Sequence, residues 1–172
     1  MNKIALIYSF NTKKTSIIAG KILEKFGSDL IDPINAEEID EKTFLSYDNL
    51  ILGVPTWFDG ELPNYWDEFV PALEEMDLTG KKIAIFGLGD QVGYPENFLD
   101  AVGIMADLLQ SRGATIVGFT SSEGYTFEHS RALRNGKFCG LAIDFENQHQ
   151  LTDDRINQWI DQLRKEFGID KS

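Results

Sequence analysis

The chain has 172 residues, of which 42% are hydrophobic, and this length suits one domain with a substantial core better than two. Its formal net charge of −12 argues against nucleic acid and anionic membrane surfaces as partners, because both select a basic face. No apolar stretch approaches the ~20 residues of a membrane span, no signal peptide is expected, and the single cysteine, Cys139, favours a reducing cytoplasm.

Apolar runs alternate with segments of helical period, which predicts repeated strand–helix units and a mainly parallel sheet. Strands are expected at 4–8, 30–32, 51–54, 83–86 and 115–119, with a strand resuming at 140–143. Helices are expected after Thr15, after Pro63, over 102–109 and over 156–167, the last of them capped by Thr152. Trp66 and Trp159 lie in these helical stripes, and we expect them in the core.

Between residues 121 and 138 the alternation fails, and this stretch carries Gly124, Asn135-Gly136 and mixed charges. We interpret it as an insertion within or beside the fifth strand. A linker is disfavoured because too little chain follows to make another domain.

The first strand runs into a loop of polar side chains that precedes a helix. These side chains are Ser9, Asn11, Thr12, Lys13, Lys14 and Thr15. Backbone amides at a helix start, aided by the helix dipole, can satisfy a phosphate, and the hydroxyls and lysines add donors and charge. The alternative is that Thr12 or Ser16 only caps the helix. A triphosphate loop is disfavoured, since no Gly-Lys-Ser/Thr ending is present.

Two further strands end in loops that bear aromatic residues. Trp57 follows the strand at 51–54, and Tyr94 follows the strand at 83–86. In a parallel sheet both loops lie at the edge where open α/β sheets bind ligands, and together they could clamp a flat ring. Asp90 could accept a hydrogen bond from a ring N–H, although an ordinary tight turn explains its loop equally well. The three loops together predict a mononucleotide site, for a flavin.

Other chemistries are poorly supported. His129 and His149 lack companions at metal-ligand spacing, Cys139 has no nearby histidine, and no Gly-x-Ser-x-Gly elbow is present. We therefore expect neither a metal site nor catalytic residues.

At these loops the chain resembles the flavodoxins, and specifically their long-chain subclass. The resemblance runs from Lys3 to Ile169 through the motifs Pro55-Thr56-Trp57, Gly60-Glu61-Leu62, Gly89-Asp90-Gln91, Gly93-Tyr94, Asn97-Phe98, Ala132-Leu133-Arg134-Asn135-Gly136-Lys137-Phe138 and Leu151-Thr152-Asp153-Asp154-Arg155. It implies an α/β fold, a doubly wound five-stranded parallel sheet of order 2-1-3-4-5 with helices on both faces. FMN would lie at the topological switch point, a rule for which flavodoxin is itself a standard example. It also implies one domain over 1–172, with an insertion at 119–140 that interrupts strand five.

The resemblance also implies which residues bind FMN. It assigns the phosphate to residues 9–15, ring stacking to Trp57 and Tyr94, and ring-edge hydrogen bonds to the region of Leu88, Gly89 and Asp90. The full expected set is Ser9, Phe10, Asn11, Thr12, Lys13, Lys14, Thr15, Pro55, Thr56, Trp57, Phe58, Asp59, Gly60, Leu88, Gly89, Asp90, Tyr94 and Glu146.

The chain departs from the family pattern in two places. The family phosphate loop reads Thr-x-Thr-Gly-x-Thr, but here Phe10 removes one hydroxyl and Lys13 replaces a glycine. Lys13 or Lys14 could compensate through charge. The second departure is Phe58, where relatives carry a smaller or polar residue. The resemblance implies that the Phe58–Asp59 peptide flips on reduction of the flavin, to a turn that points the Phe58 carbonyl at the proton on the ring. We expect this turn to need positive φ, which a non-glycine residue resists by roughly 1–2 kcal/mol.

The function implied is a low-potential one-electron carrier that holds FMN non-covalently and is not an enzyme. Each acidic side chain ~10 Å from the ring would disfavour added negative charge by about 0.8 kcal/mol, so that three could lower a one-electron potential by roughly 100 mV. Candidates are Asp59, Glu61, Asp90 and Glu146. The implied partners are ferredoxin–NADP reductase-type enzymes and photosystem I or other low-potential donors and acceptors, and the chain is expected to be a monomer. Its acidity either steers basic partners or serves solubility alone.

Two other functions have sequence requirements of their own. An FMN-dependent NAD(P)H:quinone-type oxidoreductase on the same fold would need room for a second planar substrate, which Trp57 and Tyr94 would occupy. A flavin-free signalling receiver would need clustered acids after the first strand and a phosphoryl-accepting aspartate after the third. This chain has Ser9-Phe10-Asn11 and Pro55-Thr56-Trp57 at those places instead.

Overall fold

A parallel sheet forms the centre of the computed structural model, which describes residues 3–169. Its main strands are β1 (Ile4–Tyr8), β2 (Ile31–Asn35), β3 (Asn49–Gly53), β4 (Lys82–Leu88) and β5 (Thr115–Val117). They are ordered β2-β1-β3-β4-β5, and every neighbouring pair is parallel. The predicted order 2-1-3-4-5 is therefore confirmed.

β4 has two different neighbours along one of its edges. Its first residues, Lys82 to Ala84, pair with β5, whereas Phe86 to Leu88 pair with β9 (Leu141–Ile143). The chain between β5 and β9 leaves this sheet and forms a small antiparallel one. Its strands are β6 (Thr120–Ser121), β8 (Lys137–Phe138) and β7 (Leu133–Arg134), in that spatial order.

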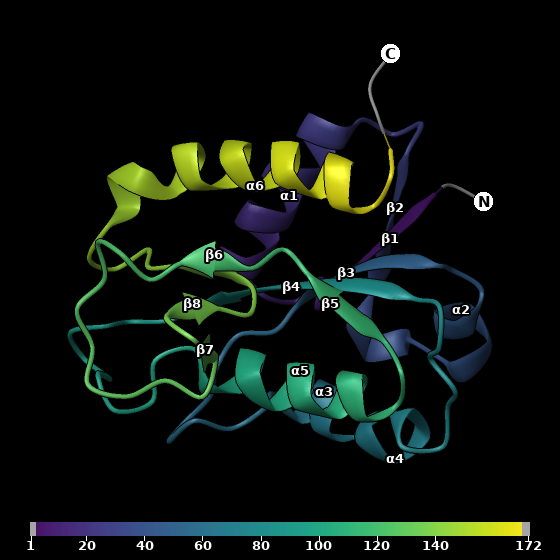
Figure 1. Cartoon of the computed structure of the whole chain (residues 1–172), viewed down its shortest axis with the longest axis horizontal. Helices are drawn as coiled ribbons and strands as arrows, with labels where there is room; N and C mark the ends of the chain where they lie inside the picture. The colour runs from purple at the N-terminus through teal and green to yellow at the C-terminus, as the bar shows by residue number, and fades with distance from the viewer. Residues whose placement is uncertain (1–2, 170–172) are drawn as a thin grey trace.

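Helices cover both faces of the sheet, as predicted (Figure 1). α1 (Lys14–Phe26) and α6 (Thr152–Glu166) lie on one face. α3 (Asn64–Asp67), α4 (Val70–Leu73) and α5 (Asp100–Ser111) lie on the other. The remaining helices are short: α2 (Glu41–Leu45) and the 3-10 turns Ala36–Glu38 and His149–Leu151.

Each face of the sheet has its own hydrophobic core, anchored by a buried tryptophan. Trp66 of α3 donates from Nε1 to the Gly53 carbonyl oxygen at 2.9 Å, and Trp159 of α6 donates to the Gly118 carbonyl oxygen at 2.8 Å. Because a buried indole N–H needs an acceptor, these bonds let both rings lie wholly inside. Their predicted place in the core is confirmed.

The structure corrects two local predictions. The single helix expected after Pro63 is two short ones, α3 and α4. Pro71 explains the break, because its ring would clash with the carbonyl four residues earlier in a continuous helix. Thr152 begins α6 but does not cap it, and its hydroxyl has no hydrogen-bond partner in the described part of the chain. The preceding 3-10 turn runs directly into α6, so Leu151 occupies the cap position.

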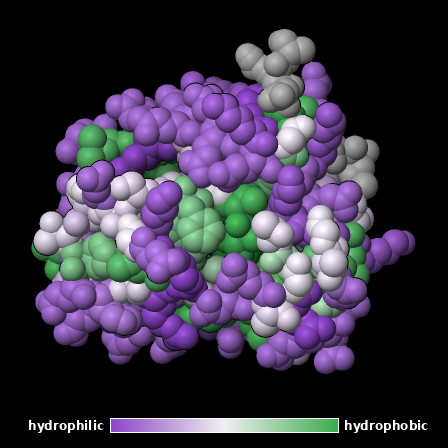
Figure 2. Space-filling view, in the orientation of Figure 1, coloured by the Kyte–Doolittle hydropathy of each residue, from purple (hydrophilic) through white to green (hydrophobic). Residues whose placement is uncertain are grey.

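Within residues 3–169, no helix has both the length and the apolar character required to cross a membrane. Figure 2 shows one face of the molecule as mainly hydrophilic, with hydrophobic residues visible only in separate patches.

Substitution of two helical glycines by alanine should change the free energy of unfolding in opposite directions. A Cβ atom at Gly103 of α5 would lie 2.1 Å from the Arg131 carbonyl oxygen, whereas one at exposed Gly20 of α1 would meet nothing within 4 Å. We expect Gly103→Ala to lower the free energy of unfolding by about 1–3 kcal/mol and Gly20→Ala to raise it by roughly 0.5–1 kcal/mol. Urea unfolding measures both changes. A neutral Gly103→Ala variant would contradict the close contact between α5 and residue 131.

Candidate functional site

A cleft of about 480 Å³ opens where β1, β3, β4 and β9 end, and we call it the main cleft. Its volume lies within the usual range for small-molecule sites. Loops that follow these four strands supply the lining. The lining residues are Thr12, Lys13, Lys14, Thr15, Pro55, Thr56, Trp57, Leu88, Gly89, Asp90, Tyr94, Phe145 and Glu146.

The loop after β1 presents the start of α1 and two lysines to the main cleft. Three other polar side chains of this loop form hydrogen bonds within the protein. Ser9 Oγ and Asn11 Nδ2 both donate to the Glu37 carboxylate, the latter at 3.1 Å. Thr12 Oγ1 donates to the Ser9 carbonyl oxygen at 2.7 Å, and no side chain caps α1. The sequence-based alternative of a simple Thr12 or Ser16 cap is therefore wrong.

Glu37 and its donors border a separate space of about 400 Å³, which we call the Glu37 cavity. Ser9, Asn11 and Thr12 line it from the loop after β1, and Trp57 separates it from the main cleft by lining both. The Tyr65 hydroxyl lies near Glu37 without a hydrogen-bond partner among residues 3–169, and burial raises the pKa of this phenol above its usual value. Sequence reasoning missed Glu37 because nothing local connects it with a loop so far away along the chain.

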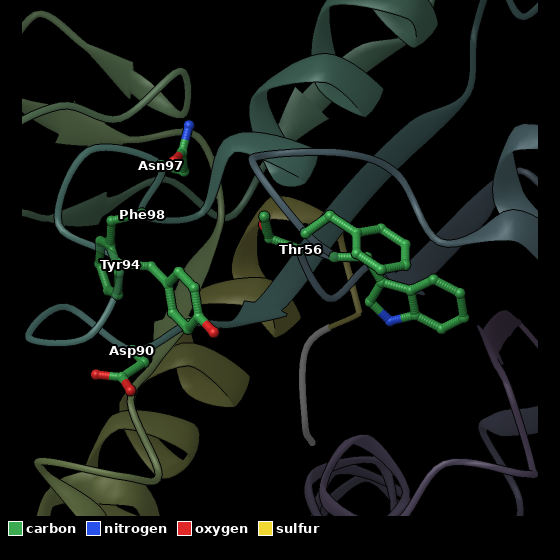
Figure 3. A pocket seen from close by; sticks show the side chains of 8 residues that line it. Thr56, Asp90, Tyr94, Asn97 and Phe98 are labelled. Atoms are coloured by element: carbon green, nitrogen blue, oxygen red, sulfur yellow. The ribbon is translucent and has the colours of Figure 1, made fainter.

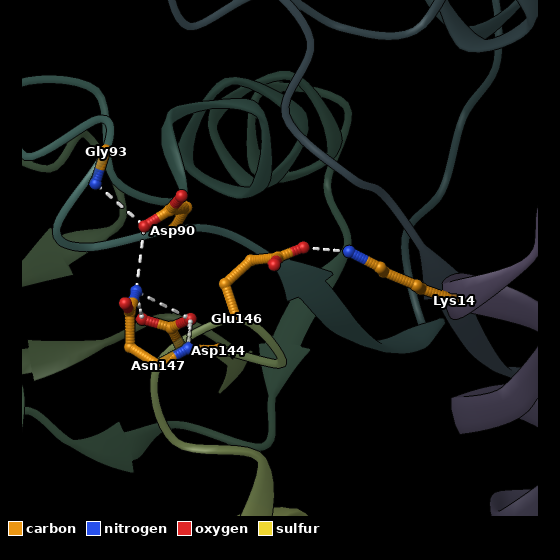
Figure 4. Close-up of polar contacts among 6 residues, drawn as sticks. All are labelled: Lys14, Asp90, Gly93, Asp144, Glu146 and Asn147. Carbon is orange, nitrogen blue, oxygen red and sulfur yellow. Dashed lines mark hydrogen bonds and ion pairs between the residues drawn. The ribbon is translucent and has the colours of Figure 1, made fainter.

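An ion pair joins opposite sides of the main cleft. Lys14, the first residue of α1, extends its Nζ to the carboxylate of Glu146, which follows β9 (Figure 4). Both side chains are about half exposed, so solvent screens the pair and its contribution to stability is small.

Trp57 and Tyr94 are aromatic lining residues from two different loops. Trp57 exchanges two backbone hydrogen bonds with Glu61, at 2.8 and 2.7 Å, and packs edge-on against Tyr65. Tyr94 is 58% exposed, and its backbone N–H donates to the Asp90 carbonyl oxygen at 2.9 Å. The structure thus brings both predicted aromatic residues to one cleft.

A third space of about 450 Å³ adjoins the main cleft, and we call it the side cavity. Figure 3 shows the side chains of Thr56 and Tyr94 entering it from different loops. Phe58, Asn97 and Phe98 also line it. Of the other residues expected at the site, Phe10, Asp59 and Gly60 line none of the three spaces described above.

The Asp90 carboxylate is directed to its own loop. Its Oδ1 accepts from the N–H groups of Gly93 and Val92, at 2.7 and 3.1 Å, and from the Asn147 side chain at 2.7 Å. The Gly93 hydrogen bond, followed by that of Asn147, holds the pKa of Asp90 below its usual range. Asp90 therefore organises the loop that carries Tyr94, a role that sequence reasoning had not separated from a direct contact with a ligand.

Other groups that could carry chemistry are the histidines, the cysteine and the acidic residues. No group of three or more His, Cys, Asp or Glu among residues 3–169 could hold a metal ion. His129 and His149 are exposed, and burial raises the pKa of the Cys139 thiol to about 11, which leaves it unreactive. Phe145 is a lining residue that sequence reasoning missed, although its place two residues after β9 and directly before Glu146 could have revealed it.

Comparison with known proteins finds one family over nearly the whole chain. The family model for flavodoxin matches residues 6–159. The chain is 45% identical to flavodoxin from a Nostoc species, over 97% of this chain and 98% of that one. It is 41% identical to flavodoxin 1 of Escherichia coli, over 96% and 95% of the two chains. The crystal structure of Fusobacterium nucleatum flavodoxin bound to flavin mononucleotide superposes with a TM-score of 0.91 at 38% identity, covering 97% of this chain and 99% of that one.

The backbone of Phe58 has a φ of 50°, in the left-handed region, and the residue is 72% exposed. Phe58→Gly and Phe58→Val both remove the ring, but only glycine accepts this φ without strain. We expect the glycine variant to exceed the valine variant in free energy of unfolding by about 1–2 kcal/mol. Urea unfolding compares them directly, and equal stabilities would show that the turn relaxes to negative φ.

Proposed function

This chain belongs to the flavodoxin family, and from that premise we propose how its main cleft serves the family's function. The protein is an electron carrier that works with FMN, and it is not an enzyme. We assign FMN to the main cleft because the two ends of the cleft differ in chemistry. One end has a helix start and two lysines, which suit a phosphate, and the other has two aromatic side chains, which suit a flat ring. None of the relatives named above favours an NAD(P)H:quinone oxidoreductase.

The phosphate of FMN would bind at the start of α1. The backbone N–H groups and dipole of that helix favour an anion, and Lys13 and Lys14 add positive charge that offsets the lost hydroxyl at Phe10. Thr12 and Thr15 line this end of the main cleft. We assign Ser9 and Asn11 an indirect role, in which their hydrogen bonds to Glu37 hold the loop in shape.

The flat ring of FMN would lie between Trp57 and Tyr94. When bound, FMN supplies the redox chemistry by taking up and releasing electrons one at a time. Trp57 and Tyr94 exclude water from its faces, while Pro55, Thr56, Leu88 and Gly89 bring backbone close to it. Phe58, in the side cavity, would lie beside the ring, and Asp59 and Gly60 shape the turn that places Trp57.

Acidic side chains set the electrostatics of the site. Asp90 and Glu146 line the main cleft, and exposed Asp59 and Glu61 lie in the loop of Trp57. Their negative charge disfavours an anionic reduced ring, so we propose low midpoint potentials. Lys14 neutralises part of this charge through Glu146.

Composition and topology also support proposals about the subclass, the oligomeric state, the compartment and the partners of this protein. We propose a single domain of the long-chain subclass, in which residues 119–140 form the insertion, since the chain leaves the main sheet between β5 and β9. We also propose a monomer in the cytoplasm, where a lone buried Cys139 would stay reduced. The partner proteins would present basic docking faces, as ferredoxin–NADP reductase-type enzymes or photosystem I would, because this chain carries a net charge of −12.

The clamp can be tested by truncating either ring. We expect Trp57→Ala and Tyr94→Ala each to weaken FMN binding by roughly 1–3 kcal/mol, the scale of lost aromatic burial and stacking. Quenching of flavin fluorescence during titration with apoprotein gives the dissociation constants. Leu45→Ala provides the control, since Leu45 is exposed at the opposite edge of the sheet, where Lys81 donates to its carbonyl oxygen. Unchanged affinity in both aromatic variants would remove the main cleft as the FMN site.

Docking can be tested through ionic strength. If acidity steers a basic partner, the rate of electron transfer to a ferredoxin–NADP reductase should fall as salt rises from low to moderate ionic strength. Stopped-flow absorbance measures that rate, and exchange with an uncharged small reductant serves as the control. A rate that does not change with salt would mean that the charge serves solubility alone.

A further inference from the structure

A buried carboxylate lies directly behind the main cleft. Asp144 follows β9 and is 0% exposed, and it takes part in none of the ion pairs among the described residues. Hydrogen bonds stabilise its charge instead. Oδ2 accepts from the backbone N–H and the side-chain amide of Gln91, at 3.1 and 2.7 Å, and Oδ1 accepts from the Asn147 N–H at 3.0 Å. Such a group is a rigid anchor, because losing any of its donors would leave a buried charge poorly solvated.

The side chain of Asn147 connects this anchor with the loop of Tyr94 (Figure 4). Its Nδ2 lies 2.7 Å from Asp90 Oδ1, 2.9 Å from Asp144 Oδ2 and 3.1 Å from Asp144 Oδ1. One neutral amide therefore donates to two carboxylates that would otherwise repel each other. Asp90 in turn accepts the backbone N–H groups of Gly93 and Tyr94, the first through its carboxylate and the second through its carbonyl oxygen.

We propose that Asn147 is a positioning residue, which ties Asp90 to the buried Asp144 and so holds the ring of Tyr94 at the main cleft. The inference rests on the proposed function, because it concerns how Tyr94 is presented to FMN. Asn147 does not line the main cleft, and its hydrogen bond to Asp90 links it to the loop of Tyr94. An uncharged donor is needed at this place, since aspartate there would add a third carboxylate and alanine would leave two facing each other.

FMN affinity tests the connection. We expect Asn147→Ala to raise the FMN dissociation constant roughly 3- to 10-fold, the effect of one lost hydrogen bond, and to raise that of riboflavin by the same factor because the change is felt at the ring. In a Tyr94→Ala background the same substitution should change the dissociation constant less than about twofold. Adding Asp90→Asn to Asn147→Ala should recover part of the loss by removing one of the two like charges.

Gln148→Ala is the matched control. The side chain of Gln148 donates to the Gly124 carbonyl oxygen, and among the described residues it makes no hydrogen bond to the Tyr94 loop. We expect it to bind FMN as the unaltered chain does. An unchanged affinity in Asn147→Ala, or an equal loss with and without Tyr94, would overturn the inference. If the unaltered apoprotein fails to bind FMN, the proposed function fails instead.

A ligand-free measurement decides the inference even in that case. Amide hydrogen exchange of the apoprotein should quicken in Asn147→Ala at Val92, Gly93 and Tyr94, whose N–H groups donate to Asp90, while the amides of β4 keep their rates. Gln148→Ala should leave all of them unchanged. Unaltered exchange in the Tyr94 loop would show that Asn147 does not hold it.

Discussion

The pairing of β4 is the constraint on which the rest of the molecule depends. This seven-residue strand pairs with β3 along one edge and with both β5 and β9 along the other. Because all these pairings are parallel, the loops after β3, β4 and β9 leave the sheet at the same edge. Trp57, Tyr94 and Glu146 follow these strands, and they meet only because β4 holds their strands in register.

Carboxylates organise the loops of the site more than they face its interior. Glu37 accepts hydrogen bonds from two side chains of the loop after β1, and Asp90 accepts them from the backbone of its own loop. Asp144 accepts hydrogen bonds from Gln91, which lies in the same loop as Asp90. Glu146 reaches across to Lys14. Composition alone relates the excess of acidic residues to solubility or partners. Some of these residues also have structural uses, since each of these carboxylates accepts hydrogen bonds from groups that would otherwise need water.

Patterns along the chain predicted the frame well but not the contacts between distant loops. Continuous apolar strands and helical stripes are local signals, and motif resemblance located Trp57 and Tyr94 in the correct loops. The turning of Ser9 and Asn11 towards Glu37 was not predictable, because it depends on how β2 lies beside β1. Pro71 did carry a local signal for the break between α3 and α4, but the hydrophobic stripe that spans both helices concealed it.

The three tryptophans of the chain fall in three separate regions, one in each helical layer and one at the main cleft. Trp66 and Trp159 are enclosed and hydrogen-bonded, whereas Trp57 lines the main cleft. The fluorescence of each tryptophan therefore reports on a different region of the molecule. Variants that keep a single tryptophan would report separately on each layer during unfolding and on occupancy of the cleft, without any attached dye.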